Sequence, residues 1–116
     1  MPSTTAYKQG DVVLVTFPFT DLTSSKQRPA VIVSPDSFNR RGEDIVLSAM
    51  TSQITPDPSA VFVARGDVVE GALPKDSQIR PLKLFTLHTS LIVKRLCRLR
   101  PETQAELLRR LRAFFE

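Results

Sequence analysis

The sequence has very few of the residues that build disulfides and metal sites. It contains a single cysteine, Cys97, and a single histidine, His88, among 116 residues. One cysteine cannot form an internal disulfide, and these two residues cannot assemble a zinc site from its usual ligands. Metal-dependent chemistry is therefore not expected, although the sequence leaves open a magnesium ion held by carboxylates.

Long apolar segments are missing as well. No apolar run approaches the roughly 20 residues that a membrane-spanning helix needs. The N-terminal stretch MPSTTAYKQG lacks the apolar core of a signal peptide. We therefore expect a cytoplasmic protein that has no membrane partner.

The chain does contain enough apolar material for one folded unit, and its charge is unevenly distributed. Because 41% of its residues are hydrophobic, residues 1–116 are expected to form a single domain. Residues 80–116 carry nine basic and three acidic side chains, whereas the net charge of the whole chain is only +4. This basic third is the predicted surface for a polyanion, unless its arginines only form a solvated helix face.

Short β-branched apolar runs separated by turn residues predict a mainly β fold. The run DVVLVTF, residues 11–17, stops at Pro18, and its unbroken apolar character is typical of a strand covered on both sides. No alternation of strands with helices is seen, so we predict a small barrel or sandwich rather than a parallel sheet. The further predicted strands are residues 30–34, 44–50, 60–64 and 84–88.

The end of the chain has a helical pattern. Pro101 suits the first turn of a helix, and the segment PETQAELLRRLRAFFE that it opens spaces its apolar residues three and four apart. We expect this apolar stripe to pack on the sheet, or in part on a partner chain. Its members are Leu107, Leu108, Leu111, Phe114 and Phe115.

The first candidate site residue is Arg28, which comes just before a predicted strand. Pro29 fixes its own backbone and biases Arg28 towards extended geometry, so the arginine is held at the strand entrance. The preceding polar segment PFTDLTSSKQ, residues 18–27, is expected to be a mobile surface loop of the kind that covers sites. The alternative is a structural arginine that pairs with Asp21 or Asp36.

The second candidate is the polar end of the predicted strand 44–50. Thr51, Ser52 and Gln53 follow this strand directly, and hydroxyl groups and backbone amides in such a position can contact a phosphate. Serine and threonine also stabilise turns routinely. This pattern by itself therefore does not separate a phosphate site from a turn.

Several stretches taken together resemble one family. GDVVLVTFPFTD is followed by KQRPAVIVSPDSFN, then by MTSQ and by SQIRPLKLFTLHTSLIVKRLCRL. This series is similar to the MazF/PemK family of toxin endoribonucleases from type II toxin-antitoxin modules, over about residues 8–115. The resemblance implies a small SH3-like, partly open β-barrel of the CcdB, MazF and PemK type with a C-terminal helix.

The resemblance also implies an activity and partners. Members of the family are mRNA interferases that cut single-stranded RNA at specific sequences, need no metal or other cofactor, usually form homodimers, and are inhibited by a cognate antitoxin protein. The ribose 2′-hydroxyl attacks the adjacent phosphate and leaves a 2′,3′-cyclic phosphate and a 5′-hydroxyl. Such a reaction needs preorganised positive charge and hydrogen bonds that stabilise the phosphorane.

Matching the motifs assigns roles to residues. By this resemblance Arg28 is the catalytic residue that stabilises the phosphorane and the candidate acid or base, although an arginine is a poor base near neutral pH. Thr51 is the catalytic hydroxyl that orients the phosphate. Ser77 and Arg80, in the stretch SQIR, are expected to bind substrate together with Ser52. The PemK branch has an aspartate where this chain has Leu82, so an acidic partner for Arg80 is missing or comes from elsewhere.

The remaining predicted RNA contacts lie around the same loop. Phe17 and Phe19 are candidates for stacking on bases, although Phe17 can equally be a core residue. His88 is a candidate base, but a single histidine at a strand end is more often structural. The polar residues expected to read the RNA are Lys26, Gln27 and Gln53.

Two other functions remain open from the sequence. One is a catalytically silent or gyrase-type toxin of the same fold that binds a protein. Leu82 favours this alternative, whereas Arg28 together with Thr51 favours the nuclease. The other is a barrel that binds nucleic acid without cutting it, for which salt-sensitive binding is the expected sign.

Overall fold

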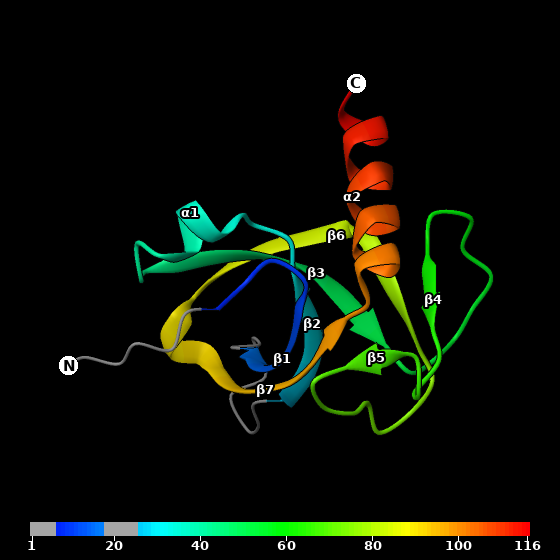
Figure 1. Cartoon of the computed structure of the whole chain (residues 1–116), viewed down its shortest axis with the longest axis horizontal. Coiled ribbons are helices and arrows are strands. Elements are labelled where there is room, and N and C mark those ends of the chain that lie inside the picture. The colour runs from blue at the N-terminus through cyan, green and yellow to red at the C-terminus, as the bar shows by residue number, and fades with distance from the viewer. Residues whose placement is uncertain (1–6, 18–25) are drawn as a thin grey trace.

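The computed structural model describes residues 7–17 and 26–116, whose strands form one antiparallel sheet in the order β4-β6-β3-β2-β1-β7-β5. The sheet curls into a nearly closed barrel (Figure 1), which confirms the predicted fold class. The short strands β4 and β5 lie at the two ends of the strand order. The strands are β1 (Asp11–Phe17), β2 (Lys26–Ile32), β3 (Asp44–Thr51), β4 (Val61–Val63), β5 (Val68–Val69), β6 (Ser77–His88) and β7 (Ile92–Leu99).

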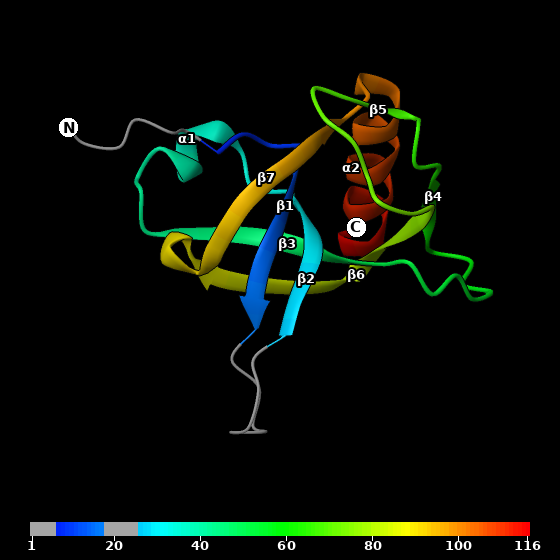
Figure 2. The same ribbon diagram turned by 90° about the horizontal axis from the view of Figure 1, so that it is seen from below.

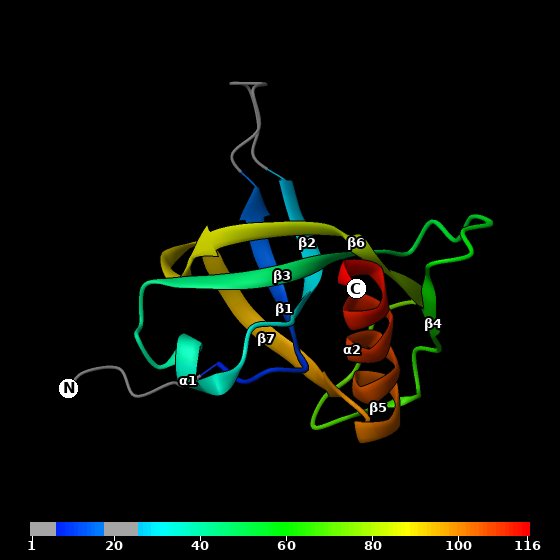
Figure 3. The ribbon, with the colours of Figure 1, turned by 90° about the horizontal axis from the view of Figure 1, so that it is seen from above.

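The described helices are α1 (Asp36–Asn39), the 3-10 turn η1 (Thr89–Leu91) and α2 (Pro101–Phe115). Helix α2 begins at Pro101 as predicted and runs beside β4 and β6 (Figures 2 and 3). Leu107 and Leu111 are buried against the sheet. Phe114 and Phe115 are 58% and 68% exposed, so the whole stripe does not pack on the sheet, and the alternative of a partner chain over this part stays a prediction. None of the described helices is long and apolar enough to cross a membrane.

Both faces of the central strands are covered, as the unbroken apolar run at residues 11–17 predicts. Successive residues of a strand point to opposite faces, and Val12 and Val13 accordingly belong to two different apolar clusters. The first cluster also takes in Leu107 and Leu111 of α2. The second is built on β1, β2 and β3, with Phe17 and other partly buried residues at its margin.

Strand β2 begins earlier than predicted. It starts at Lys26 rather than at residue 30, so Arg28 and Pro29 lie inside the strand instead of at its entrance, and Lys26 and Gln27 do not belong to a loop. Pro29 is tolerated because β3 pairs with β2 only from Ala30 onward, which leaves a free side for a residue without an N–H.

Strand β6 joins two segments that the sequence separates. The stretches SQIR and LFTLH form a single strand of 12 residues, and its register with β3 shifts between Arg80 and Leu84. Pro81 lies in this irregular part, where a missing N–H does least harm to the ladder. Strand β7 was not predicted, because Lys94, Arg95 and Arg98 interrupt its apolar pattern.

Candidate anion-binding pocket

The sheet register brings the two main candidate residues to the same place. Strands β2 and β3 pair Ala30 with Ala49 as the last pair of their ladder. Continued by two residues, the same register would set Arg28 against Thr51, on the face of the sheet that Ala30 and Ala49 share. The ladder between the strands stops at Ala30, so the sheet is open at this step. Arg28 and Thr51, 23 positions apart in the sequence, therefore share one end of the sheet.

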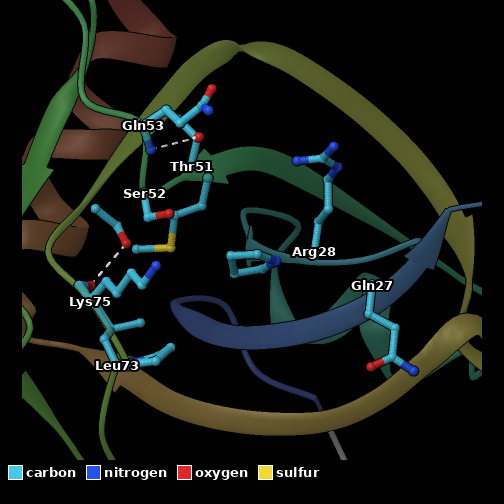
Figure 4. Close-up of a pocket in the computed structure, with 11 residues that line it drawn as sticks. Gln27, Arg28, Thr51, Ser52, Gln53, Leu73 and Lys75 are labelled. Carbon is cyan, nitrogen blue, oxygen red and sulfur yellow. Dashed lines mark hydrogen bonds between the residues drawn. The ribbon is translucent and has the colours of Figure 1, made fainter.

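A pocket of about 420 Å³ opens at this end of the sheet. Two of its walls are β2 and the end of β3. The segment that leads into β6 forms the third wall, because β3 and β6 pair Thr51 with Gln78. Figure 4 shows the Arg28 guanidinium directed towards the side where Thr51 lies, whereas the Gln27 side chain points away from it. The lining residues are Gln27, Arg28, Pro29, Met50, Thr51, Ser52, Gln53, Leu73, Pro74, Lys75 and Ser77.

The described lining of the pocket is positively charged. It contains two cations, Arg28 and Lys75, and no carboxylate. Within the described part of the chain neither cation has an ion pair or a hydrogen bond to its charged group. Asp36, one of the two acids considered for Arg28, instead accepts a hydrogen bond from the backbone N–H of Gln9 at 2.8 Å. The other, Asp21, lies outside the described residues.

Hydroxyl groups in the pocket are held in defined orientations. The backbone N–H of Gln53 donates to Oγ1 of Thr51 at 3.1 Å, which leaves the hydroxyl proton of Thr51 available to a ligand. The Ser77 hydroxyl donates to the backbone carbonyl of Lys75 at 3.0 Å and is directed by that bond. The site can therefore offer charge and hydrogen-bond donors to an anion.

Six of the residues predicted from the sequence line this pocket, and three other described ones do not. The six are Gln27, Arg28, Thr51, Ser52, Gln53 and Ser77. Phe17 instead packs against Phe85, with ring centroids 4.9 Å apart, at the margin of the second apolar cluster. Lys26 is exposed at the start of β2 and is not part of the lining. Phe19 lies outside the described residues.

Arg80 is also outside the pocket lining, and its acidic partner is Asp57. Nε of Arg80 lies 3.5 Å from Oδ2 of Asp57. Hydrogen bonds from the side chain and backbone of Ser59 lower the pKa of Asp57, and the Arg80 guanidinium lowers it further. Leu82, at the position where the PemK branch has an aspartate, is 43% exposed. The carboxylate next to Arg80 is thus supplied by the loop between β3 and β4.

His88 and Cys97 have structural surroundings. His88 ends β6, at the opposite end from Ser77, and its Nδ1 accepts a hydrogen bond from the backbone N–H of Ser90 at 3.1 Å. Burial raises the pKa of the Cys97 thiol to about 11, which keeps it protonated near neutral pH. In residues 7–17 and 26–116 no group of three or more His, Cys, Asp or Glu side chains comes together as a metal site.

Lys75 is the site residue that sequence reasoning missed. It belongs to the turn before β6, and only the pairing of Thr51 with Gln78 brings that turn to the end of β3. The visible signal was a lysine directly before the stretch DSQIR. A single basic residue in a turn is too common to be singled out without the strand order.

Solved structures define the class of fold. A mycobacterial structure described as an endoribonuclease in complex with its cognate antitoxin is 20% identical, covers 96% of this chain and 94% of its own, and has a TM-score of 0.75. MazF in the MazE-MazF complex (Form-III) from Deinococcus radiodurans is 19% identical, with 95% and 96% covered and a TM-score of 0.75. The Mycobacterium tuberculosis toxin MazF-mt6 is 12% identical, with 90% and 95% covered and a TM-score of 0.72. These likenesses define a MazF-type β-barrel.

The sequence itself gives the family. Residues 8–115 match the family described as the PemK-like, MazF-like toxin of type II toxin-antitoxin systems. The chain therefore belongs to this toxin family, as its motifs predict. A comparison with curated proteins found no match.

Proposed function

We propose that the protein is an endoribonuclease toxin that cuts single-stranded RNA in the pocket between Arg28 and Thr51. The observation that carries this proposal is a pocket with two unpaired cations, three hydroxyl-bearing residues and no carboxylate among its described lining. Such a lining favours a phosphate over a cation or an apolar ligand. The membership of the toxin family and the likeness to proteins described as endoribonucleases support it.

The proposed reaction is an internal transesterification of RNA. The 2′-oxygen forms a bond to phosphorus, and the bond between phosphorus and the 5′-oxygen breaks. The products are a 2′,3′-cyclic phosphate and a 5′-hydroxyl, with no oxidation or reduction. The 2′-hydroxyl gives up one proton and the 5′-oxygen takes one up, so the protons balance. Neither a histidine nor a carboxylate belongs to the described lining.

Arg28 and Thr51 divide the work on the phosphate in this proposal. The guanidinium of Arg28 offers several donors and a permanent charge to the phosphorane oxygens, on which negative charge develops. The Thr51 hydroxyl, which accepts from the N–H of Gln53, donates its proton to a phosphate oxygen. That Arg28 also moves a proton stays a prediction.

No metal ion takes part in the proposed reaction. Hard divalent cations bind through carboxylate and carbonyl oxygens, and the described lining of the pocket has no carboxylate. The fixed charge of Arg28 would take over the stabilisation that a metal supplies in other nucleases.

The proposed partners follow from the family. We expect a cognate antitoxin to inhibit the protein, because two of the similar structures are described as toxin complexes with an antitoxin or with MazE. Three further expectations stay predictions: that the chain folds as one toxin domain, that it forms a homodimer, and that it acts in the cytoplasm. Light scattering on the purified chain tests the dimer.

The direct test is cleavage of a long unstructured RNA by the purified, antitoxin-free protein in EDTA, next to Arg28→Ala. We expect cuts at specific sites with cyclic-phosphate and 5′-hydroxyl ends, and no detectable cuts with the variant over the same reaction time. Intact RNA with a well-folded wild-type protein would refute the nuclease and favour a toxin that binds a protein.

A further inference from the structure

Lys75 is the second cation of the pocket, and it comes from a different wall than Arg28. Arg28 extends from the sheet, whereas Lys75 belongs to the turn that leads into β6. Figure 4 shows its side chain extending into the pocket from the side opposite Arg28. The two charges therefore approach a ligand from two directions.

The backbone around Lys75 is fixed on both sides. Its carbonyl accepts the hydroxyl of Ser77 at 3.0 Å, and the neighbouring Asp76 carboxylate accepts the backbone N–H of Arg65 at 2.8 Å. Two residues before Lys75, Leu73 is only 3% exposed and belongs to the first apolar cluster. Because this turn is already ordered, little backbone entropy is lost when the Lys75 side chain binds a ligand.

The turn begins at a strained corner that leaves it little freedom. Glu70 has a φ of 54°, and Gly71 has a φ of 143°. A Cβ on Gly71 would lie 2.1 Å from the carbonyl oxygen of Leu96 in β7, so the chain passes against β7 there. Arg95 of β7 also holds the Glu70 carboxylate, at 3.3 Å. The path from β5 to Lys75 is thus fixed by close contacts with β7.

No acid of residues 7–17 and 26–116 neutralises Lys75. Asp76 is its neighbour in the sequence, but the Asp76 carboxylate accepts from the Arg65 backbone, and no ion pair with Lys75 is formed in the described structure. A lysine ammonium is a compact charge with three donors, and it has no preference for a planar partner that binds in a bidentate manner. Such a group suits a single phosphate oxygen better than a base edge.

We propose that Lys75 binds the phosphate next to the one that is cleaved, so that the pocket holds two successive phosphates of the RNA. Arg28 and Thr51 face the scissile phosphate on one wall, and Lys75 takes a neighbouring phosphate on the other. This inference rests on the proposed ribonuclease function and adds a residue that contacts the substrate. Lys75 thereby sets the position of the strand along the pocket rather than the chemistry of the cut.

The experiment measures kcat and KM for the cleavage of one unstructured RNA over a range of salt concentrations. It compares the wild-type protein with Lys75→Gln, Lys75→Arg and Lys83→Gln. Lys83 is an exposed lysine of β6 that does not line the pocket, so its loss removes the same charge elsewhere. Thermal melting of each variant checks the fold.

For Lys75→Gln we expect KM to rise about tenfold with kcat changed by less than about twofold. The slope of log(kcat/KM) against log salt should become shallower by about 0.7, the value for one lost phosphate contact on a single strand. Lys75→Arg should restore both values, and Lys83→Gln should leave them near those of the wild type. A merely structural role would not move the salt slope.

If the wild type cleaves RNA and Lys75→Gln has the same KM and salt slope as Lys83→Gln, the second phosphate contact is refuted and the proposed nuclease stands. A failure of Lys75→Arg to restore the slope would also refute it, because the arginine keeps the charge. If the folded wild type does not cleave RNA, the proposed function falls and this inference falls with it.

Discussion

The pocket and the C-terminal third of the chain use positive charge in opposite ways. Residues 80–116 contain nine of the 16 basic side chains, and six of the nine form ion pairs with carboxylates. The pocket has only Arg28 and Lys75, and neither is paired within the described structure. The six paired residues are Arg80, Arg95, Arg98, Arg100, Arg109 and Arg110.

In the proposed account, the phosphate site is marked by unpaired cations that line a pocket, and not by the number of charges in a region. An arginine that already holds a carboxylate must give up that pair before it binds a phosphate. Arg98, for example, lies 3.0 Å from Asp11, which is 2% exposed. Removing an arginine from a buried carboxylate leaves an uncompensated charge and is costly. The basic third was predicted as the polyanion surface, but these pairs assign much of its charge to structure.

The largest effect that would test this comparison is expected at Arg28. Arg28→Ala should reduce RNA cleavage by about a hundredfold to a thousandfold, as for the loss of a donor that stabilises transition-state charge. The matched control is Arg109→Ala, which removes the same charge from an exposed residue paired with Glu106 at 2.6 Å. Its cleavage rate should stay near that of the wild type. An equal loss in both variants would contradict the claim that the unpaired pocket cation matters more for cleavage than a paired surface arginine.

A large effect on stability is expected in the C-terminal region. Leu107 is 1% exposed and joins α2 to the first apolar cluster. Leu107→Ala should lower the free energy of unfolding by about 2–5 kcal/mol through lost burial and a cavity. Chemical denaturation measures this loss. The cleavage rate per folded molecule should not change, and a selective loss of activity in a fully folded variant would show that α2 belongs to the site.

A smaller effect is expected at Thr51. Thr51→Val keeps the shape of the side chain but removes the hydroxyl, and we expect cleavage to fall about tenfold to a hundredfold. Thr51→Ser should keep most of the activity. Single-turnover kinetics with excess enzyme measures the chemical step in both variants. Full activity in Thr51→Val would remove this hydroxyl from the mechanism and leave the charge of Arg28 to act on its own.

The smallest effect is expected at Glu106, whose pKa is lowered from 4.5 to about 2 by hydrogen bonds from Arg109 and then Arg110. A lowered pKa stabilises the folded state above the unfolded value, and this stabilisation is lost as the pH falls from about 4.5 to about 2. Acidification over this range should therefore lower the melting temperature of the wild type more than that of the Glu106→Gln variant. Because the pair is exposed, the difference should be small. Equal losses would show that these arginines are not effectively paired.

Strands with strong local patterns could be predicted, and those set by their partners could not. Residues 11–17 and helix 101–115 have patterns that point to one structure, and both were located to within one residue. Strand β7 could not be predicted, because its basic residues interrupt the apolar pattern and its structure depends on pairing with β1 and β5. Strand β6 contains Pro81, and a proline argues against a central strand. The irregular register with β3 that accommodates it is visible only in the structure.

The same limit applies to the site. Arg28 and Thr51 could be singled out because each stands beside a strand pattern that is visible in the sequence. Their proximity, and the part taken by Lys75, depend on a strand order in which β3 lies between β2 and β6. Arg80 was assigned to the substrate, but its partner Asp57 comes from a loop whose position no local pattern gives.

The measurement that tests the central claim most directly is the salt dependence of RNA binding by two double variants. Arg28→Gln/Lys75→Gln removes the two pocket cations, and Arg100→Gln/Arg109→Gln removes two exposed, paired arginines, so both proteins have the same net charge. Single-stranded RNA with 2′-O-methyl groups serves as the ligand, because it cannot be cut by 2′-hydroxyl attack. We predict that the slope of log K against log salt becomes shallower by about 1.4 in the pocket variant and changes little in the other. An equal or larger change in the Arg100/Arg109 variant would contradict the account.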